Sequence, residues 1–390
     1  MLDLERLRAD TPSASRQVYL NNAGASLMPA PVVQAMHAYI DLEAERGGHN
    51  TMLQEAARLQ QVYRSVATLL HAQPAEIALM QSASTAWQMA FYSMPLRPGD
   101  VVLTCEAEYG ANAVALLHRQ RRDGICVQVV PSTAEGEIDL QALQRMITPA
   151  VKLISLTWIP TNGGLTQPAA EVGRIARAHG VPYLLDACQA VGQMPVDVQA
   201  LGCDMLSATG RKFLRGPRGT GFLYVRHAFM ETLAPHTLDH TAASWTATDA
   251  YTVRDDALRY ETYEANYASR IGLGVAVDYA LDVGLADIAD RCRMLAMRLR
   301  DGLAGLPGVT VHDIGRDRNA ICTFSTTHMP AADVVASAAR QGISLSVSSP
   351  SSTRFDAERR HLPDLVRASP HYFNTEADVD HLLNVVAALG

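Results

Sequence analysis

The chain has 390 residues, more than one hydrophobic core usually serves, so we expect a large domain and a smaller one. Hydrophobic residues make up 48% and charged residues 19%, an ordinary globular composition in which no segment is polar enough to predict disorder. The formal net charge of -7 gives no reason to expect a nucleic-acid or anionic-membrane partner, because both need clustered cations.

The N-terminal residues and the cysteines favour a cytoplasmic location. The first ten residues mix acids with bases and contain no apolar run, so we predict no signal peptide. No apolar run reaches the roughly 18 residues of a membrane span. The six cysteines include no CxxC pair, which disfavours a disulfide framework and a structural metal site.

Helical apolar spacing runs from about Pro31 to Leu70, and short β-rich segments then alternate with helical ones. Most of these segments are continuous apolar runs, which is typical of strands covered on both faces in a mostly parallel sheet. The sequence therefore predicts an α/β fold, with ligands at the carboxyl ends of the strands. The seven predicted strands are Glu76 to Met80, Val101 to Cys105, Ile125 to Val130, Val151 to Ile159, Val181 to Ala187, Cys203 to Thr209 and Thr220 to Arg226.

The rest of the chain predicts a small α+β unit. The polar run from Thr237 to Asp256 predicts a long loop between the two units. Helical spacing resumes from Ser269 to Leu306, and three short β-rich segments then surround a helix from Ala331 to Gln341. We expect three parts: an N-terminal segment that packs with the small domain (residues 1–20), a large domain (21–265) and a small domain (266–390).

Lys212 lies between a predicted strand and a glycine-rich loop, and it is one of only two lysines in the chain. A lysine forms a Schiff base only when it is deprotonated, and burial beside Arg211 and Arg215 would favour that form. The alternative is a solvated loop lysine. Lys212 is therefore a candidate for covalent attachment of a cofactor.

Asp186 ends another predicted strand, where its carboxylate needs a partner. A pyridinium nitrogen would supply one, and a protonated ring nitrogen makes a pyridoxal cofactor an electron sink. Gln189 lies three residues on, within reach of the phenolic oxygen of the same ring. The alternative is that Asp186 caps a following helix.

Ser84 and Thr85 follow the first predicted strand, where a helix begins. Hydroxyl side chains and free N–H groups at a helix N-terminus bind anions, so both residues are candidate phosphate ligands. Simple capping of the helix is the alternative.

These candidates lie at the carboxyl ends of strands, in an order that resembles the fold-type I pyridoxal-5′-phosphate (PLP) enzymes. The specific resemblance is to the class V aminotransferase family, which includes cysteine desulfurases. Val18 to Ser26 resembles that family's opening Y-L-D-N-A-A motif, and Arg367 to Asp380 resembles its closing R-x-S-x-x-x-Y-N-T segment. The resemblance therefore spans nearly the whole chain. It implies a PLP cofactor, no metal, a small amino-acid substrate and a homodimer whose subunits complete each other's active sites. The segment from Thr237 to Asn266, which includes Trp245, would cross to the other subunit; the alternative is a surface lid.

The resemblance implies a role for several residues that bind the cofactor. Lys212 would bind PLP as a Schiff base, Asp186 would face the ring nitrogen, and Gln189 would face the phenolic oxygen. Thr209 matches a hydroxyl that binds the phosphate. Tyr109 matches an aromatic residue that stacks on the cofactor ring.

The remaining implied residues surround the phenolic oxygen and the substrate. Asn162, or its neighbour Thr161, would lie near the phenolic oxygen. Arg367 matches the arginine that binds the α-carboxylate of the substrate, a bidentate task that suits a guanidinium group. Asn22 and Ala23 would flank the same carboxylate.

Two departures from the family pattern bear on the reaction. Residues 344–354 contain no cysteine, whereas family desulfurases have a nucleophilic cysteine there, and this disfavours a desulfurase. Glu264 and Asn266 also stand where many relatives have a glycine–threonine pair that reaches the phosphate of the neighbouring subunit. With Tyr109, this segment looks most like the branch that contains hercynylcysteine sulfoxide lyase.

The sequence therefore favours a C–S lyase that acts on a cysteine-derived S-conjugate or sulfoxide. Elimination at Cβ would give pyruvate, ammonia and a thiol or sulfenate, with Tyr109 or His371 as the candidate proton donor. The alternatives are a class V aminotransferase, an amino-acid epimerase and a non-catalytic protein of the same fold. A Rossmann dehydrogenase is disfavoured because no GxGxxG follows the first strand.

Overall fold

A seven-stranded sheet forms the centre of the computed structural model, which describes residues 2–389. The strand order is β2-β8-β7-β6-β5-β3-β4; β8 is antiparallel to both of its neighbours, and the other pairs are parallel. The predicted mostly parallel α/β sheet is confirmed. Its strands are β2 (Ile77–Met80), β3 (Val101–Cys105), β4 (Cys126–Val130), β5 (Val151–Thr157), β6 (Tyr183–Asp186), β7 (Met205–Thr209) and β8 (Gly221–Val225).

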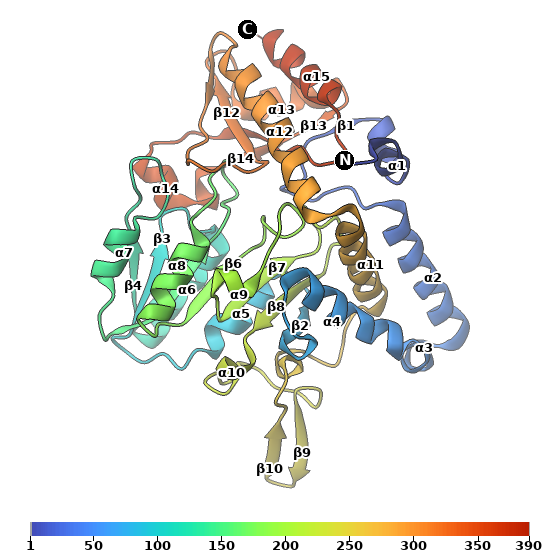
Figure 1. The fold of residues 1–390 in the computed structure, drawn as a ribbon, viewed down its shortest axis with the longest axis vertical. Helices are drawn as coiled ribbons and strands as arrows, with labels where there is room; N and C mark the ends of the chain where they lie inside the picture. Colours follow the sequence, from blue (N-terminus) through green and yellow to red (C-terminus); the bar gives the residue numbers. More distant parts are fainter. Residues whose placement is uncertain (1, 390) are drawn as a thin grey trace.

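Burial explains why the apolar runs predicted these strands. Every side chain of β2, β3, β6, β7 and β8 is buried, because helices cover both faces of the sheet (Figure 1). Only β4, at the edge of the sheet, exposes alternate side chains.

Helices of the large unit surround this sheet. The predicted helical region before the first strand is interrupted at Gly47, which has a φ of 80° that ends α2. The helices are α2 (Ala30–Arg46), α3 (Gly48–Gln54), α4 (Ala56–Leu70), α5 (Ala83–Ser93), α6 (Gly110–Asp123), α7 (Leu140–Met146), α8 (Ala169–Ala178), α9 (Val198–Leu201) and α10 (His227–Met230).

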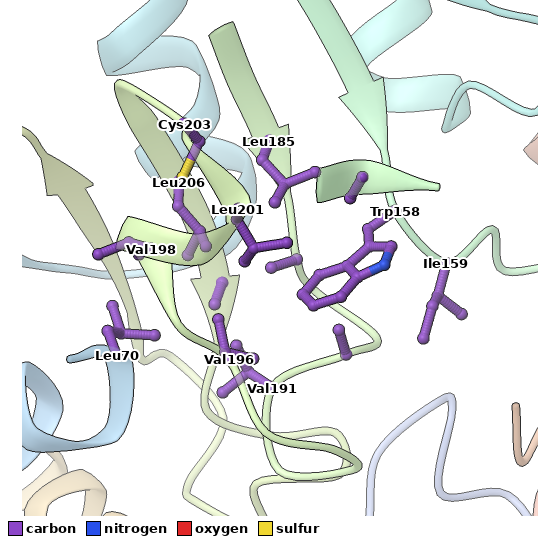
Figure 2. Close-up of a cluster of buried hydrophobic side chains, with 14 of the residues drawn as sticks. Leu70, Trp158, Ile159, Leu185, Val191, Val196, Val198, Leu201, Cys203 and Leu206 are labelled. Carbon is purple, nitrogen blue, oxygen red and sulfur yellow. The ribbon is translucent and has the colours of Figure 1, made fainter. Parts of the chain in front are cut away.

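An apolar cluster holds the ends of the central strands in place. Figure 2 shows Leu185 of β6, Leu206 of β7 and Trp158, which follows β5, gathered with Leu201 of α9. Burying each such side chain stabilises the fold by about 1.5–3 kcal/mol. Successive side chains of a strand point to opposite faces of the sheet. Because Leu185 points into this cluster, the next residue, Asp186, points to the other face.

A smaller α+β unit lies above the large sheet in Figure 1, and the long helix α12 leads up into it. Its antiparallel sheet has the order β11-β12-β15-β14. The strands are β11 (Val309–Val311), β12 (Cys322–Thr326), β14 (Ser346–Ser348) and β15 (Leu365–Ala368). The helices of the C-terminal part of the chain are α11 (Tyr267–Val283), α12 (Leu285–Ala304), α13 (Ala331–Arg340), α14 (Arg354–Arg359) and α15 (Glu376–Ala387).

The N-terminal segment joins this smaller unit. After α1 (Leu4–Ala9), β1 (Val18–Tyr19) pairs in parallel with β13 (Ile343–Ser344). In contrast, α11 packs against α2 and α4 of the large unit. The domain division at residue 266 therefore stays a prediction. No helix within residues 2–389 is long and apolar enough to cross a membrane.

The polar run that predicted a loop instead contains a hairpin, which projects below the sheet in Figure 1. Its strands are β9 (Ala243–Ala247) and β10 (Ala250–Val253). The prediction of a loop was wrong here because the hairpin buries almost no side chain, so it lacks the alternating polarity of a half-buried strand. Short 3₁₀ helices elsewhere are Pro12–Ser15, Pro74–Glu76, Ala257–Tyr260 and Pro350–Ser352.

Candidate active site

Adjacent parallel strands bring Asp186 and Lys212 to one edge of the sheet. Asp186 ends β6 and pairs with Ser207 of β7, and Lys212 follows the end of β7 by three residues. Both side chains are buried, at 5% and 7% exposure. Residues 188–190 form turns rather than a helix, so Asp186 caps no helix; its carboxylate accepts from Cys188 N at 2.9 Å.

One amide bridges Asp186 to a second buried carboxylate. Asn112 Nδ2 donates to Asp186 Oδ2 at 2.8 Å and to Glu108 Oε1 at 3.0 Å. Glu108 also accepts from the hydroxyls of Thr104 at 2.6 Å and Thr157 at 2.5 Å. Burial raises the pKa of both carboxyls, and these hydrogen bonds oppose that rise. Neither Glu108 nor Asn112 was predicted, although both belong to the E-Y-G-A-N segment at the start of α6.

The surroundings of Lys212 favour its neutral amine. Burial lowers the pKa of Lys212; Arg211 and Arg367 lower it further, whereas Cys188 and Asp186 raise it. A neutral amine is the form that reacts with a carbonyl carbon. The ring of Tyr109 also faces this amine, with Lys212 Nζ 5.9 Å from the ring centroid.

Arg215 was expected beside Lys212, but it belongs to a different contact. Its guanidinium donates to Tyr372 Oη at 2.8 Å and to Thr11 Oγ1 at 2.6 Å. It also lies 4.5 Å from the ring centroid of Phe373. Arg215 therefore ties the loop after Lys212 to the two chain termini.

The predicted phosphate ligands lie where the N-terminus of α5 meets the carboxyl end of β7. Ser82, not Ser84, caps α5, and the hydroxyl of Thr85 accepts from Ser82 N at 3.0 Å in a capping box. A Cβ on Gly221, which pairs with Thr209, would lie 2.9 Å from Ala83 N. Thr209 and the N-terminus of α5 are thus neighbours. The first N–H groups of α5 have no intrahelical acceptor and suit an anion.

Arg367 lies on β15 of the small unit and reaches the large unit through Thr161. Its Nη1 donates to Thr161 Oγ1 at 2.6 Å, and its Nη2 donates to Asn21 Oδ1 at 3.3 Å. Gln189 Nε2 lies 3.5 Å from the same Thr161 hydroxyl. Of the two residues left open by the sequence, Thr161 contacts Gln189 and Arg367. Asn162 instead donates to Ser349 O at 3.0 Å.

Asn22 and Ala23 also lie beside these residues, but the Asn22 side chain is fully engaged. Asn22 Nδ2 donates to Ser369 O at 2.7 Å, and its Oδ1 accepts from Ser26 Oγ at 2.6 Å. Ala23 O accepts from Gln189 Nε2 at 3.2 Å. The turn that contains Asn22 therefore connects β15 to Gln189, the residue predicted to face the phenolic oxygen of PLP.

His371 does not fit the role of proton donor. It is fully buried, with Nε2 2.7 Å from Phe213 O and Nδ1 3.4 Å from Cys292 Sγ. Burial and the nearby Arg215 hold its pKa well below the ordinary value. Of the two candidates, only Tyr109 faces Lys212.

The polar groups of this edge fit PLP. Gln189 Oε1 and Arg367 Nε are buried without a hydrogen-bond partner among the described residues, which is costly unless a ligand pairs with them. Lys212 supplies an amine for the aldehyde, Asp186 a carboxylate for the ring nitrogen, and the N-terminus of α5 an anion site. These are the three groups by which a pyridoxal phosphate can be held.

Comparison with known proteins identifies relatives over the whole chain. The aminotransferase class-V family model matches residues 18–382. A probable cysteine desulfurase of Methanothermobacter thermautotrophicus is 30% identical over 397 residues, covering 99% of this chain and 98% of its own. A cysteine desulfurase of Yersinia pestis is 30% identical over 394 residues, covering 97% and 96%.

Solved structures of cysteine desulfurases are also similar to this chain over nearly its whole length. A cysteine desulfurase of Thermococcus onnurineus has a TM-score of 0.93 at 25% identity, covering 100% of this chain and 98% of its own. The cysteine desulfurase CsdA of Escherichia coli has a TM-score of 0.91 at 26% identity, with 100% and 98% covered. A mutant of C-DES with glycine covalently linked to PLP has the same fold, with a TM-score of 0.89 at 22% identity over 98% and 99%.

These relatives overturn the reaction favoured by the sequence. The prediction favoured an eliminating C–S lyase and disfavoured a desulfurase. It is wrong, because the relatives that match this chain over nearly its whole length are named as cysteine desulfurases. The narrower resemblance to hercynylcysteine sulfoxide lyase finds no support among the relatives named above. That prediction relied on the absence of a cysteine from residues 344–354, although the rest of the chain resembles cysteine desulfurases. By its whole-chain match, this protein belongs to the class V aminotransferase family of fold-type I enzymes and uses PLP as its cofactor.

Proposed function

We propose that this protein is a cysteine desulfurase, which breaks the Cβ–S bond of L-cysteine and releases L-alanine. One observation carries the proposal. Lys212, Asp186 and Arg367, far apart in sequence, surround one edge of the sheet in a chain that is similar to cysteine desulfurases from end to end.

The side chains divide the work as follows. Arg367 binds the α-carboxylate of the substrate and thereby orients its α-carbon. Lys212, kept neutral by burial and by nearby arginines, accepts the α-proton and returns it. Asp186, held by Asn112, keeps a proton on the ring nitrogen. When bound, PLP supplies an electron sink for the electrons released at the α-carbon.

The sulfur needs an acceptor outside residues 344–354. That segment approaches the site, since Ser349 O accepts from Asn162 and a Cβ on Gly110 would lie 2.7 Å from Ser351 O, but it carries serines in place of a thiol. We therefore propose an external thiol as the acceptor. The Cβ–S bond breaks, an S–S bond forms on the acceptor, and Cβ keeps an electron pair and takes a proton. Cysteine and a thiol thus give alanine and a persulfide, with no added oxidant.

The test is product analysis with L-cysteine and excess dithiothreitol, which releases the transferred sulfur as sulfide. We expect equal amounts of alanine and sulfide. Pyruvate and ammonia in place of alanine, or no turnover, would refute the proposal.

Lys212 offers a matched control, because the chain has only one other lysine, Lys152. Lys152 is exposed and donates to Pro149 O at 2.7 Å. Borohydride reduction should label the peptide with Lys212 in the wild type and in Lys152→Ala, and should label nothing in Lys212→Ala. A label on Lys152 would contradict the assignment of Lys212 as the PLP-binding residue.

We also propose a homodimer whose interface includes the hairpin β9–β10. Trp245 and Tyr251 are cross-strand partners on the hairpin, exposed at 78% and 63%. Exposed aromatic pairs of this kind are typical of interfaces. Sedimentation should show a dimer that Trp245→Ser weakens. Met297→Ser, which changes an exposed side chain of α12, should not weaken it. A monomeric wild type would exclude the proposal.

The cytoplasmic location stays a proposal as well. It is supported by the six cysteines, which include the buried Cys105 and Cys203 and form no disulfide among the described residues. Free thiols persist in a reducing compartment. Fractionation of cells that express the protein tests it, and recovery in a membrane or secreted fraction would refute it.

A further inference from the structure

A cavity outside the candidate active site lies where the two units meet. Its volume is about 840 Å³, within the ordinary range of small-molecule sites. One side is formed by the segment after β5 with α7 and α8, and the other by the loop between β11 and β12. Backbone hydrogen bonds join the two sides: Thr166 N donates to Asp317 O at 3.1 Å, and Gly315 N donates to Glu135 O at 2.8 Å. The cavity is therefore bounded by segments of both units.

The floor of this cavity is apolar and belongs to the cluster behind Asp186. Figure 2 shows the Trp158 ring gathered with Leu201, and both side chains line the cavity. The same cluster contains Leu185, whereas Asp186 points to the other face of the sheet. Further apolar lining comes from Ile138, Leu140, Ala169 and Met194. Such a floor suits an apolar ring, which gains free energy when aromatic and aliphatic side chains replace water around it.

One buried amide of the cavity lacks a hydrogen-bond partner. Gln167 lines the cavity and is 2% exposed. Its Oε1 accepts from Ile138 N at 2.8 Å, which fixes the orientation of the amide, and its Nε2 has no partner among the described residues. A buried donor is costly until an acceptor meets it. Gln167 Nε2 therefore suits a carbonyl oxygen of a ligand.

The rim of the cavity is acidic. Its charged residues are the four carboxylates Glu137, Asp139, Glu171 and Asp317 and the guanidinium of Arg316. Arg316 already pairs with Glu135 at 3.1 Å, and none of the four carboxylates forms an ion pair within residues 2–389. Glu171 and Asp317 are also exposed. A rim of this charge attracts a cation and disfavours an anion.

We propose that this cavity binds a small organic cation in which an apolar ring carries a carbonyl group. The ring lies on Trp158, the carbonyl oxygen accepts from Gln167 Nε2, and the cation faces Glu171 and Asp317. The site goes beyond the proposed desulfurase reaction and does not depend on it, because none of its lining residues is a candidate for binding PLP or the substrate.

The test compares three ligands by calorimetric titration of the PLP-loaded enzyme. The first, 4-(2-dimethylaminoethyl)benzamide, has the ring, the carbonyl and the cation, and its tertiary amine forms no Schiff base with PLP. The second, N,N-dimethyl-2-phenylethylamine, lacks the carbonyl, and the third, 4-ethylbenzamide, lacks the charge. The first ligand should bind about tenfold more tightly than the second, because only it meets the amide of Gln167. It should bind about threefold more tightly than the third, since charges on an exposed rim attract weakly.

Gln167→Met removes the donor and keeps the length of the side chain. The tenfold advantage of the carbonyl ligand should then fall below about twofold. Gln141→Met is the matched control, because Gln141 also lines the cavity but is exposed, and it should keep the full advantage. Thermal unfolding of each variant separates a loss of binding from a loss of the fold.

The charge of the rim is tested separately. Glu171→Gln combined with Asp317→Asn should abolish the advantage of the cation over 4-ethylbenzamide. Glu231→Gln combined with Asp333→Asn removes two exposed charges outside the cavity and should leave that advantage unchanged.

Equal binding of the three ligands to the wild type overturns the proposal, as does an undiminished advantage of the carbonyl in Gln167→Met. No binding by any of them also overturns it and leaves the amide of Gln167 to a water molecule. If the first ligand binds the PLP-free protein at least tenfold more tightly than the loaded enzyme, it occupies the PLP site and the proposal fails. The titration needs no turnover, so a failure to form alanine from cysteine does not affect this result.

Discussion

The amide of Asn112, placed between the carboxylates of Glu108 and Asp186, allows a quantitative prediction. Asn112→Leu keeps the volume of the side chain but removes both donors. A hydrogen bond to a charged group contributes about 1.5–3 kcal/mol, so losing two costs about 3–6 kcal/mol when both carboxyls are ionised. The side chain is 3% exposed, and solvent can replace little of this loss.

The destabilisation caused by Asn112→Leu should depend on pH. Burial already raises the pKa of Glu108 and Asp186 in the folded protein, and loss of Asn112 raises both further. A carboxyl whose folded pKa exceeds its unfolded value stabilises the fold at low pH, and this stability is lost as the pH rises through the folded pKa. Bonds to neutral carboxyls contribute only about 0.5–1.5 kcal/mol each, so the cost of Asn112→Leu should be smaller at pH 5 than at pH 8 and should approach about 1–3 kcal/mol where both carboxyls are protonated.

Urea unfolding of the cofactor-free protein at pH 5 and pH 8 measures this difference through the buried Trp87 and Trp158. Asn384→Leu, on the exposed face of α15, is the control and should change the free energy of unfolding by less than about 0.5 kcal/mol. A cost for Asn112→Leu below about 1 kcal/mol, or one that is equal at the two pH values, would refute the charged bridge.

Three further substitutions test the surroundings of the site. Arg300→Met should destabilise the fold by about 3–5 kcal/mol because it leaves Asp313 buried and unpaired, and thermal unfolding close to wild type would count against this. Gly192→Ala should weaken PLP binding at least tenfold, since Gly192 has a φ of 82° and a Cβ there would collide with the backbone of Leu214; an unchanged Kd would rule this out. Thr161→Val removes the hydroxyl that accepts from Arg367, the guanidinium that we propose binds the substrate carboxylate, so the KM for L-cysteine should rise about tenfold with little change in kcat. A fall in kcat alone would disprove the positioning role of Thr161.

The sequence alone predicted the central sheet and the strand ends at which the candidate residues lie. It could do so because strands buried on both faces need continuous apolar runs, and because Asp186 and Lys212 interrupt the pattern where such strands end. The hairpin β9–β10 was missed because exposed strands carry no such signal.

The partners of each side chain were decided only by the tertiary structure. The hydrogen bond from Asn112 to Asp186 joins residues 74 positions apart, and the one from Arg367 to Thr161 joins residues 206 positions apart. Spacing along one strand or helix cannot encode such contacts, because they depend on how separate elements pack. For the same reason the prediction that Arg215 lies beside Lys212 was wrong. Arg215 instead contacts the segments near the two chain termini, and Arg211 is the arginine that lies near Lys212.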